Sequence, residues 1–279
     1  MKSQITFTVS FRGSLGKLLV LSTLAPLALI CCAQTAEKKA EDQAATVIRR
    51  QIEIDEDAPN SMNPKGLRIH FSRIGDVQLP GGHVVRYRLR VPGAPEKQSY
   101  VLAVWRIGAP MSYFHSKVYT NAKGLLMQHP PLAEQENLDS LKKDDEIEVD
   151  LKAARGEPIR YMLASSDDKL FFPGGIVLHP AASKGGNCRL EARLAFPEGQ
   201  AVLLYGDGLA PGLQIPMQIV SAGDTRTQML TANKQGHAVA VVAPYVTGKS
   251  AGVLKMSVAA TGCSASIEIP WGKGSYHPL

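Results

Sequence analysis

The segment CRLEARL, residues 188–194, alternates apolar and charged side chains at every second position. A period of two is the signature of a β-strand with one buried and one solvated face. Similar segments recur at intervals of about 8–12 residues with turn residues between them, a spacing typical of β-sandwiches. We therefore predict further strands at 201–205, 213–220, 225–231, 238–244, 253–259 and 263–269.

The preceding part of the chain has the same pattern, in VRYRLRV (85–91) and EIEVDL (146–151). Residues 132–143 lack β-branched side chains and are expected to form a short helix or a long loop. One-sided burial is typical of antiparallel sheets. We therefore predict an all-β fold of two antiparallel, immunoglobulin-like β-sandwich domains, 47–182 and 183–279, with a linker around 180–186. Strands are also expected at 67–72, 100–105, 159–164 and 172–179.

Composition excludes several other classes of protein. The chain has 279 residues, of which 44% are hydrophobic and 20% are charged, with 25 Gly and 18 Pro. A disordered chain would carry more charge and fewer apolar residues. The glycines lack the three-residue period of collagen, and charge is too sparse for a coiled coil.

The N-terminus has the layout of a secretory signal peptide. Three basic residues precede an apolar run at 18–30, and small residues follow at Cys31 and Ala33. The run is shorter than the roughly 20 residues that a membrane-spanning helix needs. We expect a signal peptide at 1–33, a polar tether at 34–46, and a periplasmic, outer-membrane-anchored or extracellular location. Removing the signal lowers the net charge from +6, which leaves too little positive charge to predict nucleic-acid binding.

Two ways of processing this signal peptide fit the sequence. Cleavage after Ala33 would release a soluble protein. Alternatively, Cys31 or Cys32 would carry a lipid, because LALIC at 27–31 resembles a bacterial lipobox. Ile30 departs from that pattern, which prefers Gly, Ala or Ser there, whereas a lipidated Cys32 would be preceded by the small Cys31. Membrane contact is expected only through such an anchor.

Cys188 and Cys263 are the cysteines of the folded part. A cysteine pair in an exported chain predicts a disulfide, because the compartment is oxidising. In the chain-entropy model this bridge would stabilise the fold by about 4.5 kcal/mol. Neither cysteine has a metal-ligand spacing to another Cys or His, so a zinc site is disfavoured. Two buried thiols remain the other alternative.

Turn sequences in the C-terminal part resemble a known family. GDGLAPG at 206–212 is similar to the Gly-x-Gly-Phe/Leu-x-Pro-Gly turn of bacterial immunoglobulin-like surface repeats, including the IPT/TIG type. TANKQGH at 231–237 resembles their hairpin, and 248–262 resembles their closing strand pair. The resemblance spans about 198–262 and implies a sandwich used for spacing or binding on the cell envelope, with no active-site residues. Antibody-type domains place a Trp between the two cysteines, whereas Trp271 follows both.

Apparent catalytic and metal motifs lack the context that their chemistry needs. Ser250 lies in a Gly-x-Ser-x-Gly pattern without a strand-to-helix elbow, and Ser166 lies in Ser-x-x-Lys without its partner motifs. A calcium loop fails because Pro59 stands at a ligand position. We therefore predict no catalytic residue, no cofactor and no metal site. The loop would begin at Asp55, Asp57 and Asn60, and the seven histidines are scattered at 70, 83, 115, 129, 179, 237 and 277.

Two charged strand faces lead to a specific structural hypothesis. Arginines at 86, 88 and 90 would repel one another unless neutralised, and Glu146, Glu148 and Asp150 form a matching acidic face. We predict that these strands pair antiparallel, each cross-strand pair contributing about 0.2–1 kcal/mol. The functional alternative is an arginine face that binds an anionic polymer or a lipid headgroup.

The sequence thus predicts a non-enzymatic exported cell-envelope protein that acts as a binding, adhesion or spacer module. Its partner would be an envelope or extracellular polymer or protein. An exposed aromatic platform, using Tyr113, Phe114, Trp271 or Tyr276, would favour a glycan. The alternative is a hydrolase of such a polymer with residues from both domains, which requires convergent carboxylates or a His with a hydroxyl partner.

Overall fold

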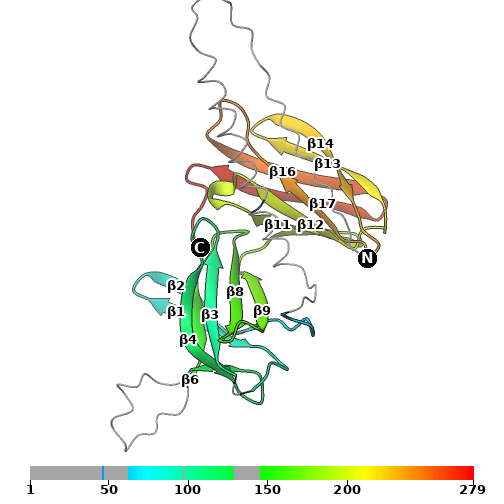
Figure 1. Ribbon diagram of the computed structural model, residues 1–279. Helices are drawn as coiled ribbons and strands as arrows, with labels where there is room; N and C mark the ends of the chain where they lie inside the picture. The colour runs from blue at the N-terminus through cyan, green and yellow to red at the C-terminus, as the bar shows by residue number, and fades with distance from the viewer. Residues whose placement is uncertain (1–45, 47–61, 97, 129–144) are drawn as a thin grey trace, which may run out of the picture. The chain divides into compact units, whose positions relative to one another are not determined.

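The computed structural model describes residue 46 and residues 62–96, 98–128 and 145–279 (Figure 1). The chain divides into two compact units, 1–47 and 48–279, and the strands of the described residues belong to the second. Within the described ranges, no helix is long and apolar enough to span a membrane. The predicted signal peptide, tether and lipidation sites Cys31 and Cys32 lie outside the described residues.

The first half of the second unit contains two antiparallel sheets. The three-stranded sheet has the order β1-β2-β7 and the six-stranded sheet the order β6-β5-β4-β3-β8-β9. Their strands are β1 (His70–Leu79), β2 (Gly82–Arg90), β3 (Tyr100–Arg106), β4 (Ser112–Thr120), β5 (Leu126–Gln128), β6 (Asp145–Glu146), β7 (Glu148–Leu151), β8 (Pro158–Ser165) and β9 (Phe171–Val177).

One hydrophobic core joins these two sheets. Leu89 of β2 and Val149 of β7 are buried in the same cluster as Tyr100, Leu102 and Leu163 of the six-stranded sheet. In β8, the alternate residues Ile159, Tyr161 and Leu163 enter this core, as the period-two pattern requires. The sheets therefore pack face to face as in a β-sandwich.

The second half contains two four-stranded antiparallel sheets, with orders β10-β11-β12-β15 and β14-β13-β16-β17. A short 3₁₀ turn, η2 (Pro197–Gly199), follows β11. The strands are β10 (Ala181–Gly185), β11 (Cys188–Leu194), β12 (Val202–Asp207), β13 (Gln214–Ser221), β14 (Asp224–Thr231), β15 (Ala238–Val242), β16 (Ala251–Ala260) and β17 (Cys263–Gly272).

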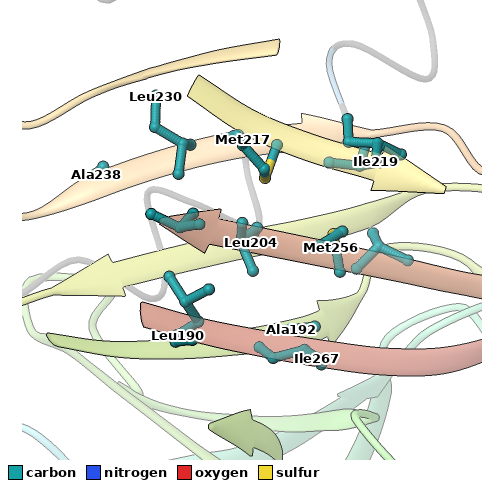
Figure 2. Close-up of a cluster of buried hydrophobic side chains, with 14 of the residues drawn as sticks. Leu190, Ala192, Leu204, Met217, Ile219, Leu230, Ala238, Met256 and Ile267 are labelled. Carbon is teal, nitrogen blue, oxygen red and sulfur yellow. The ribbon is translucent and has the colours of Figure 1, made fainter. Parts of the chain in front are cut away.

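A second core lies between these sheets (Figure 2). Leu190 and Leu204 point into it from one sheet, and Met217, Met256 and Ile267 from the other. All five are at most 3% exposed. Burial of a Leu, Ile or Met side chain stabilises a fold by about 1.5–3 kcal/mol, so this core is the main support of the sheet pair.

The predicted disulfide is present. Sγ of Cys188 and Sγ of Cys263 are 2.01 Å apart, and the bridge links the first residue of β11 to the first residue of β17. It therefore joins the two sheets covalently. The nearby turn requires glycine, because a Cβ at Gly208, whose φ is +70°, would lie 2.2 Å from the carbonyl oxygen of Asn187.

The predicted all-β class is confirmed, and the linker interpretation is corrected. Residues 181–185, assigned to a linker around 180–186, form β10 and pair with β11 in register Ala181 to Ala192. Strands β4 and β5 were not predicted, and the segment 132–143 lies outside the described residues. The division into two domains at 182/183 stays a prediction.

Candidate binding surface on a bulged strand

Strand β4 departs from regular pairing at two places. Ala103 of β3 lies opposite Tyr113, but Leu102 lies opposite His115, so Phe114 is an extra residue. A second irregularity follows, because Tyr100 pairs with Val118. β-bulges of this kind bend a strand and re-aim its side chains, and they are frequent beside binding and active sites.

The second irregularity contains strained backbone. Lys117 has a φ of +61°, in the left-handed region that non-glycine residues rarely adopt. An L-residue there costs about 1–2 kcal/mol. Such strain persists only where the surrounding structure holds it, and it concentrates at functional sites. Strand β4 is therefore a candidate location for a binding site.

Three large apolar side chains at the start of this strand are exposed. Tyr113 is 81% exposed, Phe114 44% and Met111 46%. The preceding connection, residues 108–110, is exposed as well. Large exposed apolar side chains that follow one another in a strand are a candidate interaction site. We name Met111, Tyr113 and Phe114 the aromatic surface.

Phe114 is anchored on aromatic rings that lead into the core. Its ring centroid lies 6.4 Å from that of Tyr161 at an angle of 89°, and Tyr161 lies 5.5 Å from Phe71. Edge-to-face pairs of this type contribute about 0.5–1.5 kcal/mol each. Tyr161 is 2% exposed, and burial raises the pKa of its phenol. The aromatic surface thus rests on a rigid, uncharged base.

His115 is the polar neighbour of this surface. Its ring centroid is 4.5 Å from that of Phe114 in a T-shaped contact. Burial lowers the pKa of His115 below 6.5, although a side-chain hydrogen bond with Gln128 opposes the shift. The imidazole is therefore neutral at pH 7. It presents no charge to a ligand at the aromatic surface.

The four aromatic residues predicted for a platform do not lie together. Trp271 is 4% exposed and belongs to the second core, which lies between the two four-stranded sheets. Tyr276 packs against the same core, and its pKa rises to about 12, mainly through burial and then through a side-chain hydrogen bond with Glu157. Only Tyr113 and Phe114 of the predicted set belong to the aromatic surface. Met111 was missed.

The predicted arginine and acid ladder is confirmed for two of its three arginines, whereas the predicted strand 146–151 is divided, with Glu146 in β6 of the six-stranded sheet and Arg90 opposite Leu125. β2 and β7 pair antiparallel with Arg86 opposite Asp150 and Arg88 opposite Glu148. Nε and Nη2 of Arg86 donate to Asp150 at 2.7 and 2.8 Å, and Nε of Arg88 lies 2.5 Å from Oε2 of Glu146. The hydrogen bond from Arg86 lowers the pKa of Asp150. These arginines are neutralised within the sheet, which removes the support for an anion-binding face at 86 and 88.

Another arginine cluster lies on β11. Glu191, 7% exposed, accepts hydrogen bonds from Nη2 of Arg189 at 2.6 Å and from Nε of Arg193 at 2.7 Å. The guanidinium of Arg193 also lies 4.4 Å from the ring centroid of Tyr205. The hollow beside this cluster has Glu191 as the single carboxylate among its lining residues. Both oxygens of this carboxylate are thus used to bind the two arginines.

The remaining motifs do not assemble a catalytic or metal site in the described part of the chain. Oγ of Ser166 donates to Oγ of Ser99 at 3.0 Å in a turn, and Ser250 precedes β16 without a helix. Nδ1 of His237 lies 2.6 Å from Oδ1 of Asp207 on an exposed turn. Among the described residues no group of three or more His, Cys, Asp or Glu could hold a metal ion. Asp55, Asp57, Asn60 and His129 lie outside these residues.

No family model matches the chain, and no curated protein matches it. One similar solved structure is a tetra-tandem repeat in the extending region of a large adhesion protein, with 9% identity and a TM-score of 0.25. The match covers 75% of this chain and 50% of that chain. The present chain thus matches half of that structure's length. A TM-score of this size does not establish a common fold, so function is argued below from this chain's own residues.

Proposed function

We propose that this protein is a non-enzymatic, exported cell-envelope module that binds a glycan through the aromatic surface of β4. The observation that carries the proposal is the exposure of Tyr113, at 81%, beside a bulge at which Phe114, 44% exposed, packs against Tyr161. A sugar ring has apolar C–H faces and polar edges, and a rigid aromatic ring offers the same combination.

The electrostatic setting supports an uncharged or weakly charged ligand. Arg86 and Arg88 of β2 are bound to Asp150, Glu148 and Glu146, and burial lowers the pKa of His115. Tyr113 and Phe114 therefore dominate the chemistry of this surface. Aromatic anchors commonly supply most of the binding energy of an interface.

Export supports the same function. The N-terminal layout of a signal peptide and the disulfide between Cys188 and Cys263 both fit an oxidising compartment. The turn sequences at 206–212, 231–237 and 248–262 fit bacterial immunoglobulin-like surface repeats. We further propose that a lipid on Cys32 or Cys31 would retain the protein at a membrane, and that cleavage after Ala33 would release it.

Co-sedimentation with insoluble envelope polysaccharides, peptidoglycan sacculi first, tests the binding function. Tyr113→Ala should weaken binding at least tenfold, the loss typical of an aromatic anchor. Tyr245→Ala is the matched control, because Tyr245 is also an exposed tyrosine, at 65%, but lies after β15. Equal binding by both variants would contradict the assignment of the surface.

Mass spectrometry of the mature N-terminus tests the export proposal separately. A diacylglyceryl mass on Cys31 or Cys32 would establish the lipid anchor. A chain that begins at Gln34 without modification would establish free secretion. Recovery of the intact chain with residues 1–33 would contradict both forms of the proposal.

A further inference from the structure

The sheet β14-β13-β16-β17 has two very different edges. At the β17 edge, the amide of Asn187 donates to the carbonyl oxygen of Gly262 at 2.8 Å, and Gly186 forms a bridge with Cys263. The disulfide lies at the same place. At the other edge, β14 pairs with β13 alone among the described strands (Figure 1).

The turn before β14 determines which of its backbone groups are unpaired. Ala222 and Gly223 have φ values of +46° and +89°, and Ser221 lies opposite Asp224. This is a two-residue hairpin turn, which closes on a hydrogen-bonded pair. Because hydrogen-bonded pairs alternate along antiparallel strands, the N–H and C=O groups that point away from β13 belong to Thr225, Thr227, Met229 and Thr231.

β14 lacks two features that protect many sheet edges, a register shift and a proline. It pairs with β13 over eight residues without a register shift, and Met229 is 51% exposed. Its charged residues, Asp224 and Arg226, lie near the turn, and the Arg226 side chain donates to the carbonyl oxygen of Ala243. Edge strands are usually protected by bulges, prolines or inward charges, and a long regular edge is a template for another strand.

Other edges in the described chain do carry such protection. β1 has a register shift between Arg73 and Gly75. β9 is covered along part of its length, because the amide of Ile69 donates to the carbonyl oxygen of Pro173 at 2.9 Å. β15 is shorter, with five residues, and Pro244 follows soon after it. β14 therefore stands apart as a regular edge.

We propose that β14 is a self-association surface, at which two copies of this chain pair their β14 strands antiparallel around Gln228. In this register Thr225 faces Thr231 of the second copy and Thr227 faces Met229. All four outward residues then lie in hydrogen-bonded pairs, which gives about eight new backbone hydrogen bonds. The two sheets become one continuous sheet across the dimer axis.

Self-complementarity is what selects a second copy as the occupant. Residues 227–231 are uncharged, and the register places Arg226 opposite Leu230 instead of another arginine. The Thr227 side chain covers the exposed Met229 of the second copy, on the sheet face opposite the core residue Leu230. Main-chain bonds supply the affinity of strand addition. Because one strand edge buries less area than a standard interface, the dimer should be weak.

Sedimentation velocity on the mature chain, from about 1 μM to 1 mM, tests the proposal. The wild type should shift from monomer to dimer with a Kd of about 10–100 μM, the weak range expected for a small interface. Thr227→Pro should weaken dimerisation at least tenfold. Proline is tolerated at an edge position whose N–H faces solvent, and Thr227→Val, which keeps that N–H, is the matched control.

Thr227→Lys keeps the test valid if the proline variant fails to fold, because an edge lysine blocks pairing without removing a donor. A wild-type chain that stays monomeric at 1 mM would overturn the proposal. Dimers that persist in both the proline and the lysine variant would overturn it as well. Binding of an unrelated extended peptide by a strictly monomeric wild type would assign the edge to a different partner.

A cysteine variant tests the register. Gln228 would face its own copy at a Cα separation of about 4.5 Å, which is within disulfide range. Gln228→Cys should therefore form an intermolecular disulfide under mild oxidation. Thr225→Cys should not, since its copy lies about 20 Å away along the strand. Equal cross-linking by both variants would contradict the register.

Discussion

Strands β13 and β4 show two ways of using an antiparallel pair. β13 pairs with β14 and β16 without a register shift, and its residues Ile215, Met217 and Ile219 all enter the core. β4 shifts register twice against β3 and leaves Tyr113 and Phe114 exposed. Regular pairing buries alternate side chains, whereas each bulge interrupts the alternation along β4. The comparison suggests that stability resides mainly in the regular sheets and recognition in the bulged one.

The largest expected effect breaks the covalent support of the regular sheets. Cys188→Ser with Cys263→Ser removes a bridge between residues 75 positions apart. The free energy of unfolding should fall by about 2–5 kcal/mol, because the unfolded chain regains the entropy of that loop. Urea denaturation followed by circular dichroism measures the change.

Either single cysteine variant should lose as much stability as the double variant, since both abolish the same bond. Reduction of the wild type should reproduce the loss. A double variant as stable as the wild type would mean that packing alone maintains the regular sheets. The regular sheets would then differ from β4 in their strand register and not in their covalent support.

A smaller effect, of opposite sign, is expected in the bulged strand. Lys117→Gly should raise the free energy of unfolding by about 0.5–1 kcal/mol. The relief of left-handed strain, about 1–2 kcal/mol, exceeds the entropic cost of glycine, about 0.5–1 kcal/mol. Chemical denaturation tests this.

Lys184→Gly is the matched control for that substitution, because Lys184 is an exposed lysine of β10 whose φ is not positive. The control should lose stability where Lys117→Gly gains it. A loss at both positions would show that backbone strain is not the dominant energy at Lys117.

The smallest expected effect is a pH dependence. Burial lowers the pKa of His115 in the folded state below 6.5, so the unfolded state binds a proton first as the pH falls. The contribution of His115 to stability is thus complete above pH 6.5 and declines as the pH drops below it. Thermal melts from pH 7.5 to pH 5 should show a decline in the wild type that is reduced in His115→Gln. Parallel curves for the two proteins would contradict the burial argument.

The regular strands were predictable because their side chains follow a strict period of two. In β17 the buried residues are Cys263, Ala265, Ile267, Ile269 and Trp271. Trp271 continues that series, so its burial could be predicted from the alternation. Its inclusion among the platform aromatics was wrong for this reason. The charge ladder was predictable for the same reason, because alternation and opposite charge coincide in β2 and β7.

The bulged strand was not predictable in this way. Between Tyr113 and Val118 the two extra residues destroy the alternation, so no window of β4 has a clear period. The exposure of Phe114 depends on where the bulge falls, which is a property of pairing with β3 and not of local sequence. β10 was not predicted for another reason, because its Ala, Ser, Lys and Gly residues have the composition of a linker.

The disulfide also has a mechanical consequence when the chain is pulled at its two ends. Tension applied between the two ends of the chain passes through the Cys188–Cys263 bond, so the residues between these cysteines carry no load while the bond is intact. At about 3.3–3.6 Å per residue, the 75-residue separation corresponds to roughly 250 Å of contour length that pulling cannot release. Strands β12 to β16 lie wholly inside this shielded loop. Reduction would therefore allow this part of the chain to lengthen under force.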